Sequence, residues 1–527
     1  MNSFINLLED RLKFYKNSYA IKNGNQYMTY DELYHRSKLL QNLLSDNKLI
    51  NNNIGIITQR NFSAYIGILG TIFSGSTYIP INLKYPKKRI SHIIDNAKIN
   101  ALICDSNDLN ILKQKLKGNK KIKILIFPDD DQVRFSNYQL ILKTDLERFS
   151  NRKIYKKYKE SNSIYIMYTS GSTGDPKGVE INDNNLLALM TNMNKFYKFK
   201  PGFKSSQTFD LSFDVSVVDT FFPLLNGGII TILSEKELYC PYDYIIRENI
   251  NLWNSVPTLA GFMNKLGFLN KNSFNKLKYS IFAGEPLTKK LADRWSAAAP
   301  NSTIENLYGP TETTIYATRF KYNKNHIRKK FTNDILPIGK TFSNLKVAIV
   351  NGSDRIIENN KIGELIISGN QVSKGYYKNN TLTGKIFKKV HWDGKKNYWY
   401  HTGDLVIKNS DGNLEFVGRN DEQIKIAGKR VEIGEIESVL RNHFHDNIAV
   451  ITAVKDANLL TKHLNCFVTT KLNKNKIEKI KNNLKKELDS VFIPKNFFYL
   501  DKLPLTTSGK INKKALQDSK VYQKNNF

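Results

Sequence analysis

One glycine- and hydroxyl-rich stretch of this chain has a composition suited to holding phosphate. It reads Tyr-Thr-Ser-Gly-Ser-Thr-Gly-Asp-Pro-Lys-Gly over residues 168–178, after an apolar run at 163–168 that we interpret as a buried strand. Small residues let backbone N–H groups approach an anion, hydroxyls add donors, and Lys177 adds charge. The spacing differs from that of a Walker A loop. A polar surface loop is the alternative, and residues 179–200 are long enough for a helix.

Acidic side chains inside an apolar stretch are a second feature with chemical meaning. Residues 209–219 carry Asp210, Asp214 and Asp219 among Phe, Val and Leu. A carboxylate is costly to bury without a partner, and a buried one can pair with the ammonium group of a substrate. The alternative is that one of these acids caps a helix that begins near Val215.

Further polar residues stand where apolar runs end. Residues 254–258 and 281–286 each read as a strand that runs into a loop, the place where α/β proteins form their sites. Residues 306–314 contain a Gly-Pro turn followed by Thr311 and Glu312, whose hydroxyl and carboxylate suit phosphate and Mg²⁺. A capped turn with an exposed glutamate is the alternative.

The elements that must position these residues alternate between helix and strand. We expect strands at residues 54–58, 77–81 and 101–104, and helices that begin at residue 29 or 31, run over 64–73 and run over 89–97. Residues 363–369 are expected to be a strand, and residues 423–437 to begin as a strand and end as a helix. Alternation of this kind predicts layered α/β sheets.

The composition is that of a globular protein with a large positive charge. The 527 residues imply more than one domain, and 80 Lys and Arg against 48 Asp and Glu give a net charge of +32. The lysines are spread along the chain without a nucleic-acid motif, so we interpret most of them as solvated surface and the remainder as attraction for acidic partners. The cysteines form no disulfide or metal pattern, and no signal peptide or membrane-spanning run is evident. We expect a cytoplasmic protein without a structural metal.

In their order and spacing, these motifs resemble those of adenylate-forming enzymes: acyl-CoA synthetases, luciferases and the adenylation domains of peptide synthetases. The resemblance extends from about residue 20 to residue 514. It implies a large N-terminal domain of layered α/β sheets with a β subdomain, residues 1–420, and a small mobile α+β domain, residues 421–527. Asp421 matches the family's hinge residue, and Lys510, which follows Ser-Gly, matches its catalytic lysine.

The resemblance also implies roles for individual residues. Lys510, Thr311 and Glu312 are the expected catalytic residues, with Glu312 as the ligand of Mg²⁺. The residues expected to bind ATP are Thr169, Ser170, Gly171, Ser172, Thr173, Gly174, Lys177, Gly284, Asn306, Leu307, Tyr308, Gly309, Pro310, Thr311, Asp404, Phe416, Arg419 and Lys510. The residues expected to bind the other substrate are Asp214, Val215, Val218, Asn254, Ile281, Ala283, Leu307, Ile315 and Tyr316.

Within the family, the chain looks most like the amino acid–carrier protein ligases, such as those for D-alanine and proline. Asp214, in Phe-Asp-Val-Ser, matches the acid that binds the α-ammonium of an amino acid. The implied function is activation of a small neutral amino acid by ATP as aminoacyl-AMP, followed by transfer to the phosphopantetheine thiol of a carrier protein. Because few residues follow Lys510, we expect this carrier to be a separate, acidic protein.

The predicted pocket ranks the amino acids without choosing one. Its wall is apolar except for Asn254, which places alanine and proline first and serine or threonine next. Ala283 stands where D-alanine ligases usually carry Cys, which argues against D-alanine, and Tyr316 fills space that prolyl pockets leave open. An acyl- or aryl-CoA ligase that uses free coenzyme A is the alternative function, and a protein that kept the fold but lost the chemistry is another.

Overall fold

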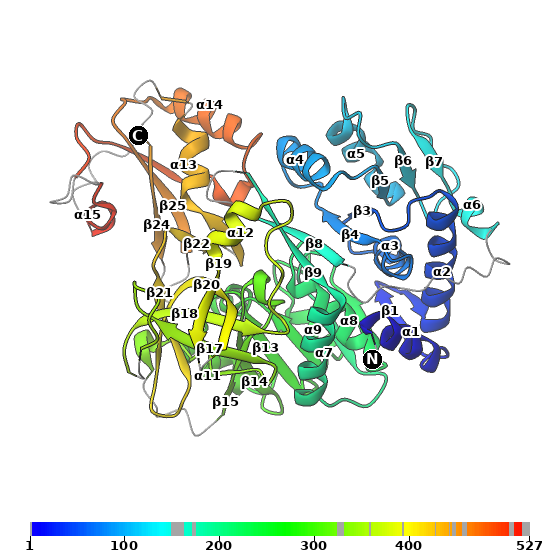
Figure 1. The fold of residues 1–527 in the computed structure, drawn as a ribbon, viewed down its shortest axis with the longest axis horizontal. Coiled ribbons are helices and arrows are strands. Elements are labelled where there is room, and N and C mark those ends of the chain that lie inside the picture. Colours follow the sequence, from blue (N-terminus) through cyan, green and yellow to red (C-terminus); the bar gives the residue numbers. More distant parts are fainter. Residues whose placement is uncertain are drawn as a thin grey trace. The chain divides into compact units, whose positions relative to one another are not determined.

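The computed structural model describes residues 3–148, 163–170, 175–323, 331–357, 360–392, 395–426, 428–441, 443–444, 449–455, 461–504 and 511–518. The chain divides into two compact units, coloured along the sequence in Figure 1. The first contains Met1–Asn82, Ile94–Tyr168 and Gly178–Asn420. The second contains Leu83–Ile93, Thr169–Lys177 and Asp421–Phe527.

Two large sheets dominate the first unit. The nine-stranded sheet has the order β16 (Lys340–Thr341), β15 (Thr318–Tyr322), β14 (Thr303–Tyr308), β13 (Tyr279–Ala283), β12 (Leu252–Ser255), β10 (Lys204–Gln207), β11 (Ile229–Ile232), β1 (Tyr19–Asn23) and β2 (Gln26–Thr29). The seven-stranded sheet has the order β7 (Gln139–Ile141), β6 (Ile124–Ile126), β5 (Ala101–Ile103), β3 (Asn53–Ile57), β4 (Thr77–Ile81), β8 (Ser163–Thr169) and β9 (Lys177–Asn182). The strands predicted at 54–58, 77–81 and 101–104 are therefore confirmed as β3, β4 and β5.

A smaller five-stranded sheet completes the strands of this unit and contains the segment predicted at 363–369. Its strands are β17 (Leu345–Val350), β18 (Gly363–Gly369), β20 (Lys395–Lys408) and β19 (Phe387–Trp392), with β21 (Leu414–Arg419) also paired to β20. These pairings are antiparallel. They form the β subdomain expected of the first unit.

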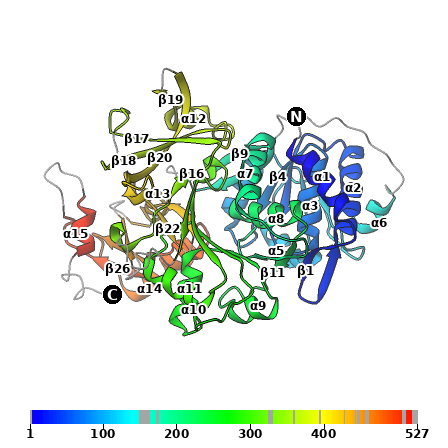
Figure 2. The ribbon, with the colours of Figure 1, turned by 90° about the horizontal axis from the view of Figure 1, so that it is seen from below.

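Helices cover both faces of the nine-stranded sheet. On one face α1 (Phe4–Phe14), α2 (Tyr30–Asp46), α3 (Phe62–Phe73), α7 (Asp183–Phe196) and α8 (Val215–Leu225) pack together (Figure 2). Their apolar core continues into both large sheets, through Ile56 of β3 and Ile230 of β11. On the other face α10 (Pro257–Lys265) and α11 (Lys289–Ala298) bury Trp253 and Trp295. The remaining helices are α4 (Lys87–Ala97), α5 (Leu109–Leu116), α6 (Lys143–Glu147), α9 (Tyr242–Arg247) and α12 (Asn380–Ile386).

Local hydrogen bonds explain where several helices begin. Thr29 caps α2, where Thr29 and Glu32 form a capping box, so the first of the two predicted caps is confirmed. Helix α1 is capped by Ser3 and by a residue distant in sequence: the carboxylate of Asp183 accepts from the N–H groups of Phe4 and Ile5, at 2.9 and 3.2 Å. Asp183 is completely buried, so this pair of bonds fixes α1 to the start of α7.

The segment at residues 179–200 contains a helix, but its first residues belong to a strand. Residues 177–182 form strand β9, in which Val179 and Ile181 are buried, and the helix α7 begins only at Asp183. Asn182 ends the strand and caps the helix by accepting from the N–H of Asn185 at 3.0 Å. The glycine- and hydroxyl-rich stretch therefore connects two neighbouring strands, β8 and β9, rather than a strand and a helix.

The second unit has its own α+β elements and its own core. They are the hairpin β22 (Gln423–Ile426) and β23 (Lys429–Glu432), the three-stranded sheet β24 (Val450–Lys455), β25 (Thr461–Val468) and β26 (Asn496–Tyr499), and the helices α13 (Ile433–Arg441), α14 (Lys474–Leu484) and α15 (Lys513–Asp518). Ile436, Leu440 and Cys466 are buried in this core. The predicted strand and helix at 423–437 are present, with β23 inserted between them.

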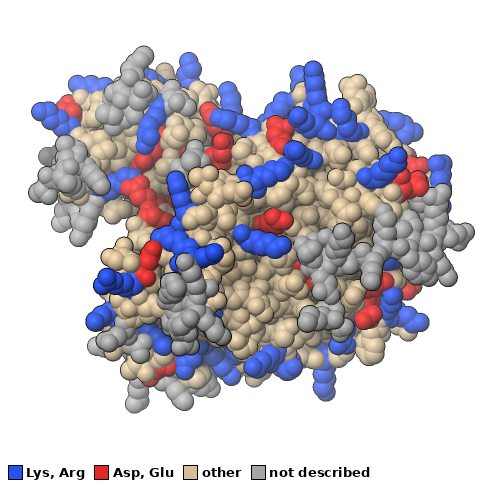
Figure 3. Space-filling view, viewed as in Figure 1, with Lys and Arg blue, Asp and Glu red and all other residues tan. Residues whose placement is uncertain are grey.

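The surface charge agrees with the expected dispersal of lysines. Figure 3 shows Lys and Arg scattered over the visible face, with Asp and Glu between them. Within the described ranges, no helix is long and apolar enough to cross a membrane.

Candidate functional site

Residues predicted to bind the substrate share one face of the nine-stranded sheet. In the register of the parallel strands β12, β13 and β14, Asn254 lies opposite Ile281, and Ala283 lies opposite Leu307. Because side chains alternate along a strand, Ile281 and Ala283 point to the same face, whereas Phe282 points to the other. The same apolar cluster also contains the predicted residues Val218, Ile315 and Tyr316.

The three acids of residues 209–219 have different environments. Asp210 belongs to a turn, where its carboxylate accepts from the N–H and hydroxyl of Ser212 and from the amide of Asn82. Asp214 stands at the N-cap of α8, but its side chain makes no capping hydrogen bond, so the helix-capping alternative does not hold. Asp219 is buried farther along α8, with 2% of its surface exposed.

The Asp219 carboxyl group is hydrogen-bonded to a residue predicted to line the pocket. Its Oδ1 accepts from Nδ2 of Asn254 at 2.7 Å. Burial raises the pKa of Asp219 to about 8, against the opposing effects of the Asn254 amide, the N–H groups of Phe209 and Thr208, and the charge of Arg60. The carboxyl is therefore mostly protonated at neutral pH and adds little charge to the interior of the site.

A tightly folded loop brings Ile315 and Tyr316 to the same place. Thr314 and Ile315 have left-handed backbone conformations, with φ of 57° and 73°, which are costly for β-branched residues. A Cβ on Gly309 would lie 2.4 Å from the carbonyl oxygen of Ile315, so only glycine allows the loop to fold back. The side-chain amide of Gln371 donates to the carbonyl of Tyr316 at 2.7 Å and to that of Thr313 at 3.3 Å.

Glu312, the predicted metal ligand, lies inside this loop. It is completely buried, and its Oε1 accepts from the hydroxyl of Tyr376 at 2.7 Å, so the alternative of an exposed glutamate does not hold. Among the residues that the structure describes, no group of three or more His, Cys, Asp or Glu side chains could hold a metal ion. A single buried carboxylate fits Mg²⁺ that is otherwise bound by water and substrate phosphates.

A second cluster joins the β subdomain to the end of β14. Asp404 on β20 is 7% exposed, and its Oδ1 accepts from Arg419 at 2.6 Å. Its Oδ2 accepts from the hydroxyl of Tyr308 at 2.5 Å. Burial and the charge of Asp404 raise the pKa of Tyr308 well above its usual value. The structure thus brings together three residues predicted to bind the nucleotide.

Comparison with known families agrees with this geometry. The family model of AMP-binding enzymes matches residues 8–377. The chain belongs to the AMP-binding enzyme family. A second model, of the C-terminal domain of AMP-binding enzymes, matches residues 435–510. The adenylate-forming fold expected from the motifs is therefore confirmed.

Individual relatives in this family include ligases and peptide synthetases. The D-alanine–D-alanyl carrier protein ligase of Staphylococcus epidermidis is 29% identical over 98% of this chain and 99% of its own length. Bacitracin synthase 1 of Bacillus licheniformis is 30% identical over 95% of this chain, which spans only 9% of that protein. Among solved structures, the Vibrio cholerae adenylation domain AlmE in complex with glycyl-adenosine-5'-phosphate is 26% identical, with a TM-score of 0.86 over 98% of this chain and 97% of that one.

Other residues predicted for this AMP-binding enzyme support or shape the backbone near the site, or lie on the elements beside it. Asn306 is buried, and its amide donates to the carbonyls of Leu336 and Pro337 at 3.3 and 3.0 Å. Gly284 follows β13 with a φ of 85°, a conformation that favours glycine. Phe416 lies half-buried on β21. Pro310 precedes the short 3₁₀ turn Thr311–Thr313, which carries the predicted residues Thr311 and Glu312.

The remaining predicted residues belong to the second unit or lie outside the described residues. In that unit the hydroxyl of Ser170 donates to the carbonyl of Arg430 at 2.6 Å, and Asp421 accepts from the N–H of Gln423 at 3.1 Å. Thr169 ends β8 and Lys177 begins β9. Gly171, Ser172, Thr173, Gly174 and Lys510 lie outside the described residues.

Sequence reasoning missed the residues that support this site from a distance. Gln371 supports the loop through a hydrogen bond to Tyr316, which is 55 residues away. Tyr376 holds Glu312, which is 64 residues away. No local pattern marks such partners. Asp219 was noticed as a buried acid but received no role, because the sequence does not reveal that Asn254 faces it.

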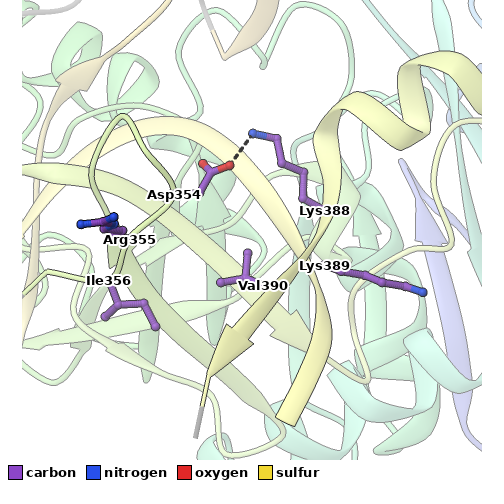
Figure 4. A pocket seen from close by; sticks show the side chains of 6 residues that line it. All are labelled: Asp354, Arg355, Ile356, Lys388, Lys389 and Val390. Atoms are coloured by element: carbon purple, nitrogen blue, oxygen red, sulfur yellow. Dashed lines mark hydrogen bonds and ion pairs between the residues drawn. The ribbon is translucent and has the colours of Figure 1, made fainter. Parts of the chain in front are cut away.

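A hollow on the β subdomain is separate from all these residues. It is lined by Asp354, Arg355, Ile356, Lys388, Lys389 and Val390 (Figure 4). Lys388 is paired with Asp354 at 2.9 Å, and Lys389 points away, over the ring of Tyr398. The hollow has the character of an ordinary charged surface.

Proposed function

We propose that the protein uses ATP to activate glycine or alanine as an aminoacyl adenylate and then transfers it to the phosphopantetheine thiol of a carrier protein. The observation that carries this proposal is the position of Asp214. It stands half-buried at the start of α8, a helix whose Val218 belongs to the same apolar cluster as Ile281 and Ala283. A carboxylate in this place suits the ammonium group of an amino acid. A fatty or aromatic acid has no such group, which favours an amino acid ligase over a CoA ligase.

The burial of the residues predicted to form the pocket favours a very short substrate side chain. Asp214 and Val215 are half-buried, whereas Val218 is 1% exposed. Four residues along a helix span roughly 6 Å. In the proposal Asn254 and Tyr316, each 1% exposed, close the far end of the substrate pocket. Glycine and alanine suit this depth better than proline, serine or threonine. The bound glycyl adenylate of the similar AlmE structure supports the same choice.

The nucleotide would lie against the second cluster. Asp404, already held by Arg419 and Tyr308, has its two carboxylate oxygens fixed in orientation. In the proposal these oxygens accept from the ribose hydroxyls, and the ring of Tyr308 borders the base. Arg419 holds Asp404 in place through their ion pair.

Catalysis would consist mainly of charge neutralisation and alignment. The carboxylate of the amino acid and the α-phosphate of ATP are both anions, so bringing them together needs fixed positive charge. Lys510 supplies this charge to the reacting groups, and the 169–177 segment with Lys177 holds the leaving pyrophosphate. Glu312 would hold Mg²⁺, which supplies further positive charge to the phosphates, and Thr311 would contact a phosphate.

The second half-reaction requires access for a thiol. We propose two domains, residues 1–420 and 421–527, with rotation at Asp421 that removes Lys510 and admits the phosphopantetheine arm. The thiol attacks the acyl carbon, AMP leaves, and the thioester forms. Support for a carrier protein comes from the similar D-alanyl carrier protein ligase, which this chain matches over nearly its whole length.

ATP–pyrophosphate exchange with a panel of amino, fatty and aromatic acids tests the first half-reaction. We expect exchange with glycine or alanine. Asp214→Asn should lower kcat/KM for the amino acid at least about tenfold, because a charged hydrogen bond is lost. Asp210→Asn is the matched control, since asparagine can form the same turn. Exchange that depends on a fatty or aromatic acid and on no amino acid would contradict the proposal.

A further inference from the structure

A chain of hydrogen bonds runs behind the proposed substrate pocket. The Oδ1 atom of Asp219 accepts from Nδ2 of Asn254 at 2.7 Å, and Oδ1 of Asn254 accepts from the hydroxyl of Tyr316 at 3.0 Å. We call these residues the Asp219–Asn254–Tyr316 chain. They come from α8, from β12 and from the loop after the 3₁₀ turn, and none is more than 2% exposed.

The structure shows one order of donors along this chain. Asn254 has one end that donates and one end that accepts. In the structure its amide nitrogen donates to the Asp219 carboxyl, which serves as the acceptor, and its oxygen accepts from the hydroxyl of Tyr316. Replacing Asp219 by an apolar residue removes the group that selects this orientation. The amide of Asn254 is then free to turn, and the hydroxyl of Tyr316 loses a defined acceptor.

The Tyr316 side chain is therefore held at both ends. At its backbone, Gln371 donates to the carbonyl oxygen, directly after the left-handed residues Thr314 and Ile315. At its hydroxyl, the bond to Asn254 fixes the direction of the ring. An aromatic side chain has only two rotatable bonds, so two fixed ends leave one position.

We propose that Asp219 is a specificity-determining positioning residue, which acts through Asn254 to hold the ring of Tyr316 across the end of the substrate pocket and so limits the substrate side chain to hydrogen or methyl. The proposal rests on the proposed function, since it concerns the pocket beside Asp214. Asp219 itself would not touch the amino acid. Its effect is on which side chains fit, so a variant should change the ratio of kcat/KM between substrates.

A purely structural role for Asp219 makes a different prediction. Loss of a buried hydrogen bond that serves only the fold would lower stability and reduce activity toward every amino acid by the same factor. Loss of a pocket wall instead relaxes discrimination between side chains of different length. Discrimination of one methylene is worth roughly 10–200-fold in kcat/KM, which sets the range to be measured.

The experiment compares exchange kinetics of the full chain with glycine, alanine, 2-aminobutyrate and valine. We expect Asp219→Leu and Tyr316→Phe each to raise kcat/KM for 2-aminobutyrate relative to glycine by about tenfold. The double variant should show no more than the larger single effect, because both changes break the same chain. Asp219→Asn retains an accepting oxygen and should restore the wild-type ratio.

Glu248→Gln is the matched control for general destabilisation. Glu248 is a buried carboxylate of the same unit, paired with Lys22 and Arg247 rather than with a member of the Asp219–Asn254–Tyr316 chain. Its substitution should lower the thermal midpoint without moving the substrate ratio. If Tyr316→Phe and Asp219→Leu leave the ratio unchanged while wild-type exchange proceeds, the inference is overturned. If the wild type exchanges with no amino acid, the proposed function itself is overturned. Should Asp219→Leu fail to fold, Asp219→Ala, which also removes the acceptor, takes its place in the comparison with Tyr316→Phe and Asp219→Asn.

Discussion

Substitution of Asp219 by asparagine should change how the stability of the protein depends on pH. The buried carboxyl keeps its proton until about pH 8, whereas an aspartic acid in the unfolded chain loses it near the ordinary value of 3.8. Between these values the native state binds one more proton than the unfolded state. The stability contributed by this group is therefore complete below pH 4 and is lost as the pH rises toward 8.

The size of the effect follows from the same two values. Each pH unit between them costs the wild-type protein about 1.4 kcal/mol of unfolding free energy, which amounts to about 4 kcal/mol between pH 5 and 8. Asparagine cannot ionise, and its side-chain oxygen still accepts from Asn254. Relative to the wild type, Asp219→Asn should therefore become steadily more stable as the pH rises over this range.

Thermal unfolding of the full chain at pH 5, 6, 7 and 8, followed by intrinsic fluorescence, measures this difference. The midpoint of Asp219→Asn minus that of the wild type should increase by several degrees. Glu248→Gln serves as the control: burial raises the pKa of Glu248, but bonds from Lys22 and Arg247 lower it more. The contribution of this carboxylate to stability is fully present above pH 5, so the midpoint of the control variant minus that of the wild type should stay constant. A flat difference for Asp219→Asn would refute the reasoning.

The remaining predictions concern the loop, the nucleotide and the hinge. Gly309→Ala places a Cβ against a backbone oxygen and should destabilise the fold by about 3 kcal/mol in denaturant unfolding, whereas Gly352→Ala, which meets nothing within 4 Å, should not. Tyr308→Phe removes a donor to Asp404 and should weaken AMP binding by about tenfold in calorimetry; an unchanged affinity would show that the hydroxyl is dispensable. Asp421→Pro should preserve exchange but reduce thioester formation, measured by mass spectrometry of the carrier, and an equal loss of both would contradict the hinge.

Much of the fold could be predicted because buried strands have a simple sequence pattern. The runs that became β3, β4 and β5 are short, apolar and flanked by turns. Strand β9 was missed because the apolar positions of Lys177–Asn182 are few and run directly into a helical segment. The helix cap at Asn182, which separates the two, is clear only once the strand is known.

The sequence predicted which residues form the site, but not how they are arranged or which of them contact each other. The motif positions identified Asn254 and Tyr316 as members of the pocket, yet only the structure shows that they bond to each other across 62 residues. Because the side chain of Asn254 is hydrogen-bonded within the protein, it no longer gives a reason to rank serine and threonine as the next substrates. Long-range partners such as Gln371 depend on tertiary packing, for which a local pattern carries no information.

The bond between Asp183 and helix α1 has a consequence for synthesis on the ribosome. Helix α1 takes two of its N-terminal hydrogen bonds from Asp183 and packs on α7 and α8. A nascent chain grows by about 5–20 residues per second, so roughly 10–40 s pass between the addition of Phe4 and that of Asp183. During that time the apolar face with Phe4, Leu8 and Leu12 lacks α7 and α8 and can pack only on earlier elements such as α2, so a chaperone can bind it. Helix α1 is thus translated well before the partners that fix its native position.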